Sequence, residues 1–203
     1  MIEYFKTHPY WIAILAALTV AAVLMWIKAI KASRAHYQEN EKIMKKLKEE
    51  NKLRNDFAVL TPALAQSADP VALFKGVSLN LQKRVADQAD LNAAFAALSP
   101  AQQGVYALYF VLDDGGEALS GFFKANTAPL TTAAGAMLET LALDDLQALF
   151  RKEALAYDPD DETTSLIPKE IEDTDAAFAA ADGCGRIAAA CGAYIAANPE
   201  AFQ

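Results

Sequence analysis

The sequence predicts an all-α protein, and three observations carry that prediction. Apolar residues recur at intervals of three and four, as on one face of an α-helix. No segment alternates between apolar and polar residues for long enough to predict a β-strand. The pairs Thr61-Pro62, Asp69-Pro70 and Ser99-Pro100 each place an N-cap residue before a proline, which suits the first position of a helix. We expect an N-terminal single transmembrane helix, a helical stalk and a compact multi-helix bundle, in that order.

The first of these elements is an apolar stretch near the N-terminus. No charged side chain occurs between Lys6 and Lys28. Because a helix rises about 1.5 Å per residue, roughly 20 residues cross a hydrocarbon core of about 30 Å. Trp11 and Trp26 stand near its two ends, where aromatic rings favour membrane interfaces. We predict a transmembrane helix at residues 9–30 after a short tail at residues 1–8. The alternative is a cleaved secretory signal, whose apolar stretch ordinarily has only about 7–15 residues.

Basic residues beside this stretch predict its orientation. Lys6 is the one Lys or Arg on its N-terminal side, whereas Lys28, Lys31 and Arg34 follow on the other side. Positively charged segments next to a span stay on the cytoplasmic side of the membrane. We therefore predict a single-pass protein of the cell membrane, with its N-terminus outside and its C-terminal domain in the cytoplasm. Lys28, Lys31 and Arg34 are predicted to contact anionic lipid headgroups.

Charge is distributed unevenly along the chain. The 18 basic and 26 acidic side chains give a net charge of −8. Residues 28–54 carry nine basic and four acidic side chains, a net charge of +5, whereas residues 55–203 carry eight basic and 21 acidic ones, a net charge of −13. Residues 31–55 lack Gly and Pro and are predicted to form a basic helical stalk. The acidic domain at residues 56–203 argues against direct nucleic-acid binding, which needs an excess of Lys and Arg.

Helix ends within this domain are marked mainly by glycine. Gly115-Gly116 are predicted to end the helix that begins at Pro100, because glycine readily adopts left-handed backbone geometry past a helix end. Gly183 and the pair Asn198-Pro199 are predicted to end later helices. The domain would then be a bundle of roughly seven or eight short helices, with small side chains where helices cross.

The domain shows no motif for catalysis or metal binding. Both histidines, His8 and His36, precede it, so it lacks the commonest general base and metal ligand. Cys184 and Cys191 would lie about 10 Å apart on a helix, too far for a disulfide. No glycine-rich phosphate loop is present. We expect no cofactor and no metal.

An acidic run between residues 158 and 175 is the strongest candidate for a functional surface. It starts like a calcium-binding loop, but Thr163 stands where the turn glycine belongs and Lys169 where the last carboxylate ligand belongs. The run is either a solvated surface or a patch that docks a basic protein. The residues predicted to contact such a partner are Asp158, Asp160, Asp161, Glu162, Glu170, Glu172, Asp173 and Asp175.

Part of the domain resembles a known family. The resemblance covers about residues 95–182 and is carried by Leu98-Ser99-Pro100, the Gly121-Phe122-Phe123 segment, Asn126, a Leu-rich helix pair around Leu138 and Leu149, and Asp175 with Phe178. In this order they are similar to a family of bacterial all-helical domains of unknown function, one branch of which consists of DNA mimics. The resemblance implies an acidic helical module that binds a protein by presenting carboxylates as a DNA duplex presents phosphates.

These observations favour a non-enzymatic function. We predict a membrane-anchored interaction module that presents an acidic helical surface to an unknown protein with a basic surface. The alternative is a membrane-tethered enzyme with a carboxylate-based pocket. Such an enzyme would show a cleft lined by two or more buried carboxylates, or by Arg186 with Tyr194. A third interpretation is a lipid-surface scaffold in which only the anchor and the stalk matter.

Overall fold

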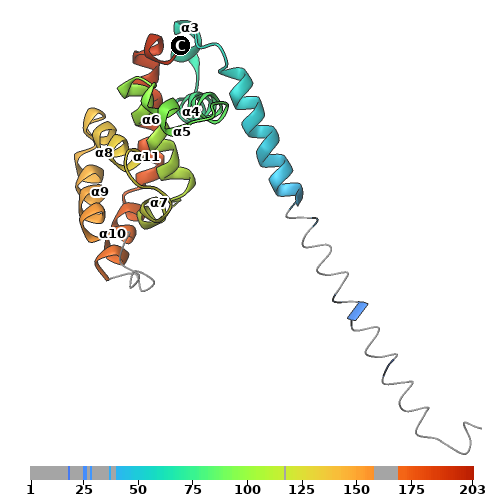
Figure 1. Cartoon of the computed structure of the whole chain (residues 1–203), viewed down its shortest axis with the longest axis vertical. Helices are drawn as coiled ribbons and strands as arrows, with labels where there is room; N and C mark the ends of the chain where they lie inside the picture. Colours follow the sequence, from blue (N-terminus) through green and yellow to red (C-terminus); the bar gives the residue numbers. More distant parts are fainter. Residues whose placement is uncertain are drawn as a thin grey trace, which may run out of the picture. The chain divides into compact units, whose positions relative to one another are not determined.

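The computed structural model describes residues 18, 25, 26, 28, 37, 40–116, 118–157 and 169–203. The chain divides into two compact units, Met1–Glu49 and Glu50–Gln203, and each is considered by itself. The described residues fold into helices joined by short turns and contain no β-strand (Figure 1). The prediction of an all-α protein is therefore confirmed.

The predicted membrane anchor falls within the first unit. Residues 9–30, the predicted transmembrane helix, lie largely outside the described residues. The described positions within that range are Leu18, Met25, Trp26 and Lys28, all helical and exposed. Within the described part of the chain, no helix combines the length and the apolar character needed to cross a bilayer. The span, its orientation and the headgroup contacts stay predictions; Lys31 and Arg34 lie outside the described residues.

The stalk and the domain consist of helices of very different length. Residues 40–56 form one helix, so the predicted stalk is helical wherever it is described. The helices that follow are α3 (Pro62–Ser67), α4 (Pro70–Ala86), α5 (Leu91–Ala96), α6 (Pro100–Asp113), α7 (Leu119–Ala125), α8 (Leu130–Thr140), α9 (Asp144–Ala156), α10 (Lys169–Ala180), α11 (Gly183–Ala197) and the 3₁₀ helix η2 (Pro199–Phe202). The C-terminal η2 packs against α3 (Figure 1).

The predicted helix starts are confirmed by side-chain hydrogen bonds. Thr61 Oγ1 accepts a hydrogen bond from the backbone N–H of Leu64 at the start of α3. Asp69 caps α4 in the same way. Ser99 and Gln102 form a reciprocal capping box at the start of α6. Each cap satisfies a backbone donor that the first turn of a helix leaves without a partner.

Two predicted helix ends are confirmed and a third is wrong. Helix α6 ends at Asp113, and Gly116 follows with a left-handed φ of 56°. Gly183, however, begins α11 instead of ending a helix; the left-handed residue at that turn is Asp182, with a φ of 49°. Gly183 allows close packing, because a Cβ there would collide with the ring of Phe178. The predicted end at Asn198 is confirmed.

Two helix pairs, α4 with α11 and α6 with α8, make the most extensive contacts in the second unit. Gly192 lets α11 approach α4, since a Cβ there would lie 2.5 Å from the carbonyl carbon of Pro70. Gly104 likewise lets α6 approach α8, since a Cβ there would lie 2.7 Å from the side chain of Met137 on α8. Small residues at these crossings agree with the sequence prediction and leave little room for any added side chain.

A side chain of α4 fixes the end of the stalk helix to the domain. Asn80 Nδ2 donates hydrogen bonds to the carbonyl oxygens of Arg54 at 2.9 Å and Phe57 at 3.1 Å. These carbonyls lie at the C-terminal end of the helix at residues 40–56, where no intrahelical donor remains. The last turns of that helix therefore belong to the folded domain.

Candidate acidic face on helix α10

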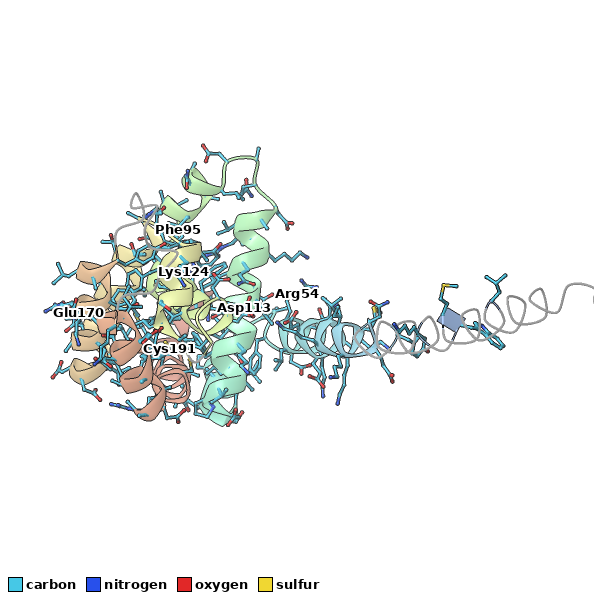
Figure 2. The ribbon with its side chains drawn as sticks, turned by 90° about the horizontal axis from the view of Figure 1, so that it is seen from below. Arg54, Phe95, Asp113, Lys124, Glu170 and Cys191 are labelled. Atoms are coloured by element: carbon cyan, nitrogen blue, oxygen red, sulfur yellow. The ribbon has the colours of Figure 1, made fainter. Side chains whose placement is uncertain are left out.

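Helix α10 buries one side and exposes an acidic one. Ile171, Thr174 and Phe178 are buried at helical spacing against the rest of the domain. Three acidic residues are exposed, and we call them the acidic face: Glu170, Glu172 and Asp173. Figure 2 shows Glu170 at the outer edge of the domain, whereas Cys191 lies within it.

The structure brings together only part of the predicted patch. Glu170, Glu172 and Asp173 are exposed on one helix, and Glu170 and Asp173 are neighbours at i,i+3 spacing. Asp175 is half-buried and points into the domain, where its carboxylate is bonded to α7. The other four predicted contact residues, Asp158, Asp160, Asp161 and Glu162, lie outside the described residues.

Asp175 caps the N-terminus of α7, a role that its position in the sequence does not indicate. Helix α7 follows Ala118, which has no side chain that could cap it. Asp175 supplies the missing acceptor: its carboxylate accepts hydrogen bonds from the backbone N–H of Ser120 at 2.8 Å and from the Ser120 hydroxyl at 2.6 Å. A carboxylate at a helix N-terminus is also favoured by the helix dipole. Asp175 thereby ties α10 to the start of α7.

Replacing Asp175 with alanine is therefore expected to destabilise the domain by about 2 kcal/mol, because two hydrogen bonds to a charged group are lost. Asp173→Ala is the matched control: Asp173 is exposed on the same helix and should change stability by no more than about 0.5 kcal/mol. Urea unfolding followed by circular dichroism measures both variants. Equal stabilities for the two would contradict the assigned role of Asp175.

A second carboxyl group lies entirely within the domain. Glu153 of α9 is 0% exposed, and neither of its carboxyl oxygens has a hydrogen-bond partner. Burial, and to a smaller extent the negative charge of Asp175, raise the pKa of Glu153 to about 7; Lys152 and Lys124 act in the opposite direction. Sequence reasoning missed this residue, although Glu153 follows Leu146 and Phe150 at helical spacing on the buried side of α9.

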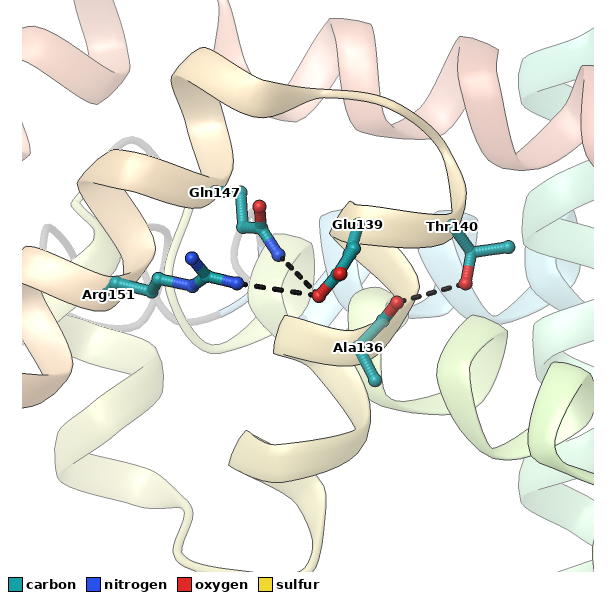
Figure 3. A network of polar contacts seen from close by, with 5 residues as sticks. All are labelled: Ala136, Glu139, Thr140, Gln147 and Arg151. Atoms are coloured by element: carbon teal, nitrogen blue, oxygen red, sulfur yellow. Dashed lines mark hydrogen bonds and ion pairs between the residues drawn. The ribbon is translucent and has the colours of Figure 1, made fainter.

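Acidic residues on neighbouring helices have cationic partners. Glu139 of α8 accepts hydrogen bonds from Gln147 Nε2 at 3.1 Å and from Arg151 at 3.4 Å (Figure 3). Asp145 of α9 receives two hydrogen bonds from the Arg186 guanidinium, which lower the pKa of its carboxyl group. Such exposed pairs add little stability, but they cancel charge locally. Exposed acids of these three helices that have no such cationic partner among the described residues are Glu170, Glu172 and Asp173 of α10 and Asp144 of α9.

The described residues do not form either of the two enzyme features that the sequence suggested. Arg186 forms an ion pair with Asp145. The ring of Tyr194 packs edge-on against that of Phe202, with 6.3 Å between the ring centroids. A hollow of about 510 Å³ lies beside α4, but its polar lining groups bond within the protein: Asn80 to backbone carbonyls, Arg84 to Gln102, and Gln203 to the Leu60 carbonyl. Glu153 and Asp175 do not line this hollow.

The two cysteines are built into helix packing. No disulfide joins them; Cys191 is fully buried, and burial raises the pKa of its thiol. Cys184 is half-buried and donates a hydrogen bond to the carbonyl oxygen of Gly116. Among the described residues, no three His, Cys, Asp or Glu side chains come together in a way that could hold a metal ion.

The fold and its surface define an all-α domain that follows a basic helix and exposes an acidic face on α10. We found no match to the sequence among protein-family models, curated proteins or solved structures. The resemblance to the family that includes DNA mimics therefore stays a prediction. The function has to be inferred from the surface itself.

Proposed function

We propose that the chain is a membrane-anchored, non-enzymatic interaction module whose acidic face binds a protein with a basic surface. Residues 9–30 hold it in the cell membrane with the N-terminus outside, and the acidic domain lies in the cytoplasm. The basic residues that follow the span contact anionic headgroups. The proposal depends mainly on one observation, that Glu170, Glu172 and Asp173 are all exposed within one stretch of α10.

Electrostatics supports this choice of partner. The domain from residue 55 onward has a net charge of −13, so the field of the whole domain adds to that of the acidic face. Exposed carboxylates at the rim of an interface lose little hydration when a partner binds. A partner rich in Lys and Arg would associate quickly and in a salt-dependent way.

The acidic residues also favour α10 itself. Glu170 and Glu172 lie in its first turn, where negative charge interacts favourably with the helix dipole. Their removal would cost a few tenths of a kcal/mol in helix stability, which is too little to unfold the domain. A loss of partner binding on neutralisation would therefore report on the surface, provided that helicity is unchanged.

The test compares two triple variants of the full chain that remove the same charge. E170Q/E172Q/D173N neutralises the acidic face, and D56N/D87N/E200Q neutralises three exposed acids elsewhere. We expect roughly tenfold weaker partner binding for the first variant, since three exposed ion pairs contribute about 0.5 kcal/mol each. Wild-type binding should also weaken at high salt, because exposed charges are screened beyond about 8–10 Å at physiological ionic strength. Equal affinities of the two variants would contradict the proposal.

The resemblance to DNA mimics suggests a narrower form of the same proposal. If the carboxylates stand in for phosphates, the partner surface is one that also binds DNA. Double-stranded DNA should then compete with the chain for its partner. A partner that binds the chain and DNA at the same time would exclude mimicry and leave the acidic docking face in place.

A further inference from the structure

Glu153 lies where three helices meet. Helix α9 carries it and packs against both α10 and α7. The side chain is 0% exposed, and neither of its carboxyl oxygens has a hydrogen-bond partner. An ionised carboxylate without partners in such a place would be costly, whereas the protonated acid is tolerated far better.

The charged groups around Glu153 belong to each of the three helices. Asp175 faces it from α10, Lys124 from α7, and Lys152 is its neighbour on α9. Asp175 accepts two hydrogen bonds from Ser120, whereas the carboxyl oxygens of Glu153 accept none. Full burial makes the ionised form of Glu153 costly. We therefore place the proton on Glu153, and its pKa of about 7 agrees with this.

We propose that Glu153 is a proton-controlled lock between α9 and α10, which holds α10 in place while protonated and releases it when ionised. On ionisation the carboxylate would gain free energy by reaching water, and separation of α10, which packs against α9 more extensively than α7 does, would expose it. Because α10 carries the acidic face, the lock would control how that face is presented; this consequence rests on the proposed function, whereas the lock itself does not.

The direction of the pH dependence follows from the two pKa values. While α10 is packed against α9, Glu153 has a pKa of about 7; once α10 has separated and Glu153 is exposed, its pKa would return to the ordinary value of 4.5. The equilibrium constant for this separation is therefore smallest at low pH. It increases as pH rises from about 4.5 to 7 and stays constant above that range. Between pH 6 and pH 8 the equilibrium constant for opening should rise roughly tenfold.

Hydrogen exchange of the full chain tests the lock without any partner. In the wild type, protection of α10 amides, corrected for intrinsic exchange rates, should fall roughly tenfold from pH 6 to pH 8. In Glu153→Gln, which cannot ionise, it should not fall, and Glu200→Gln, an exposed control, should behave like the wild type. Equal falls in wild type and Glu153→Gln, or none in the wild type, would overturn the lock.

A second measurement needs no variant. The carboxyl carbon of Glu153, followed by nuclear magnetic resonance in the wild type, should titrate together with the α10 amide signals. Titration of Glu153 with no response of α10 would overturn the proposal even if Glu153→Gln failed to fold. Partner binding enters neither measurement, so the lock and the acidic docking face can fail independently.

Discussion

Replacing Gly192 with alanine is expected to lower the free energy of unfolding by about 3 kcal/mol. The added Cβ would collide with the carbonyl oxygen of Pro70 and lie 2.5 Å from its carbonyl carbon. Both are backbone atoms, so no rotamer change relieves the clash. Relief requires that α11 and α4, one of the two most extensively packed helix pairs, move apart. Chemical unfolding of the full chain in mild detergent, followed by circular dichroism, measures the loss.

A second glycine provides the control. Gly135 lies on α8, and a Cβ there would have ordinary contacts, 3.4 Å from the Phe150 ring at the closest. Alanine is favoured over glycine inside a helix by up to about 1 kcal/mol, so Gly135→Ala should be neutral or stabilising. A stabilising effect of Gly192→Ala would contradict the close approach of α4 and α11 at this residue.

The second large effect concerns Glu153 and pH. A buried acid whose pKa is raised from 4.5 to about 7 binds its proton more tightly in the folded than in the unfolded chain. Its contribution to stability is therefore fully present below pH 4.5 and is lost as pH rises through 7, a change on the order of 3 kcal/mol. Glu153→Gln keeps the shape and removes the titration.

The comparison of stability curves isolates this one group. Other carboxyl groups titrate as well, so the informative quantity is the difference between Glu153→Gln and the wild type. The free energy of unfolding of Glu153→Gln, relative to that of the wild type, should increase by about 3 kcal/mol between pH 4.5 and pH 8. Glu200→Gln should show no such growth. Parallel curves for Glu153→Gln and the wild type would mean that Glu153 is not buried in its neutral form.

The features that the sequence predicted correctly depend on neighbours along the chain. Thr61, Asp69 and Ser99 cap helices through backbone groups three residues away. Such contacts follow from local geometry, so residue type and spacing suffice to predict them. The same holds for the left-handed Gly116, which stands three residues after the last residue of α6.

The features that it missed depend on tertiary packing. Asp175 looks like one more member of an acidic run, but its partner Ser120 lies 55 residues earlier. Gly183 looks like a helix stop, yet the backbone bends so that its lack of a side chain makes room for the nearby ring of Phe178. Glu153 differs from these two, because its place in an apolar helical pattern could have indicated a buried acid.

Proximity labelling from the C-terminus of the full chain in cells tests the central claim most directly, that the acidic face holds a partner in the cytoplasm. A labelling enzyme fused after Gln203 should mark cytoplasmic proteins with basic surfaces in the wild type and in D56N/D87N/E200Q. That labelling should be lost in E170Q/E172Q/D173N. Unchanged labelling in that variant, or labelling confined to proteins outside the cell, would contradict the account.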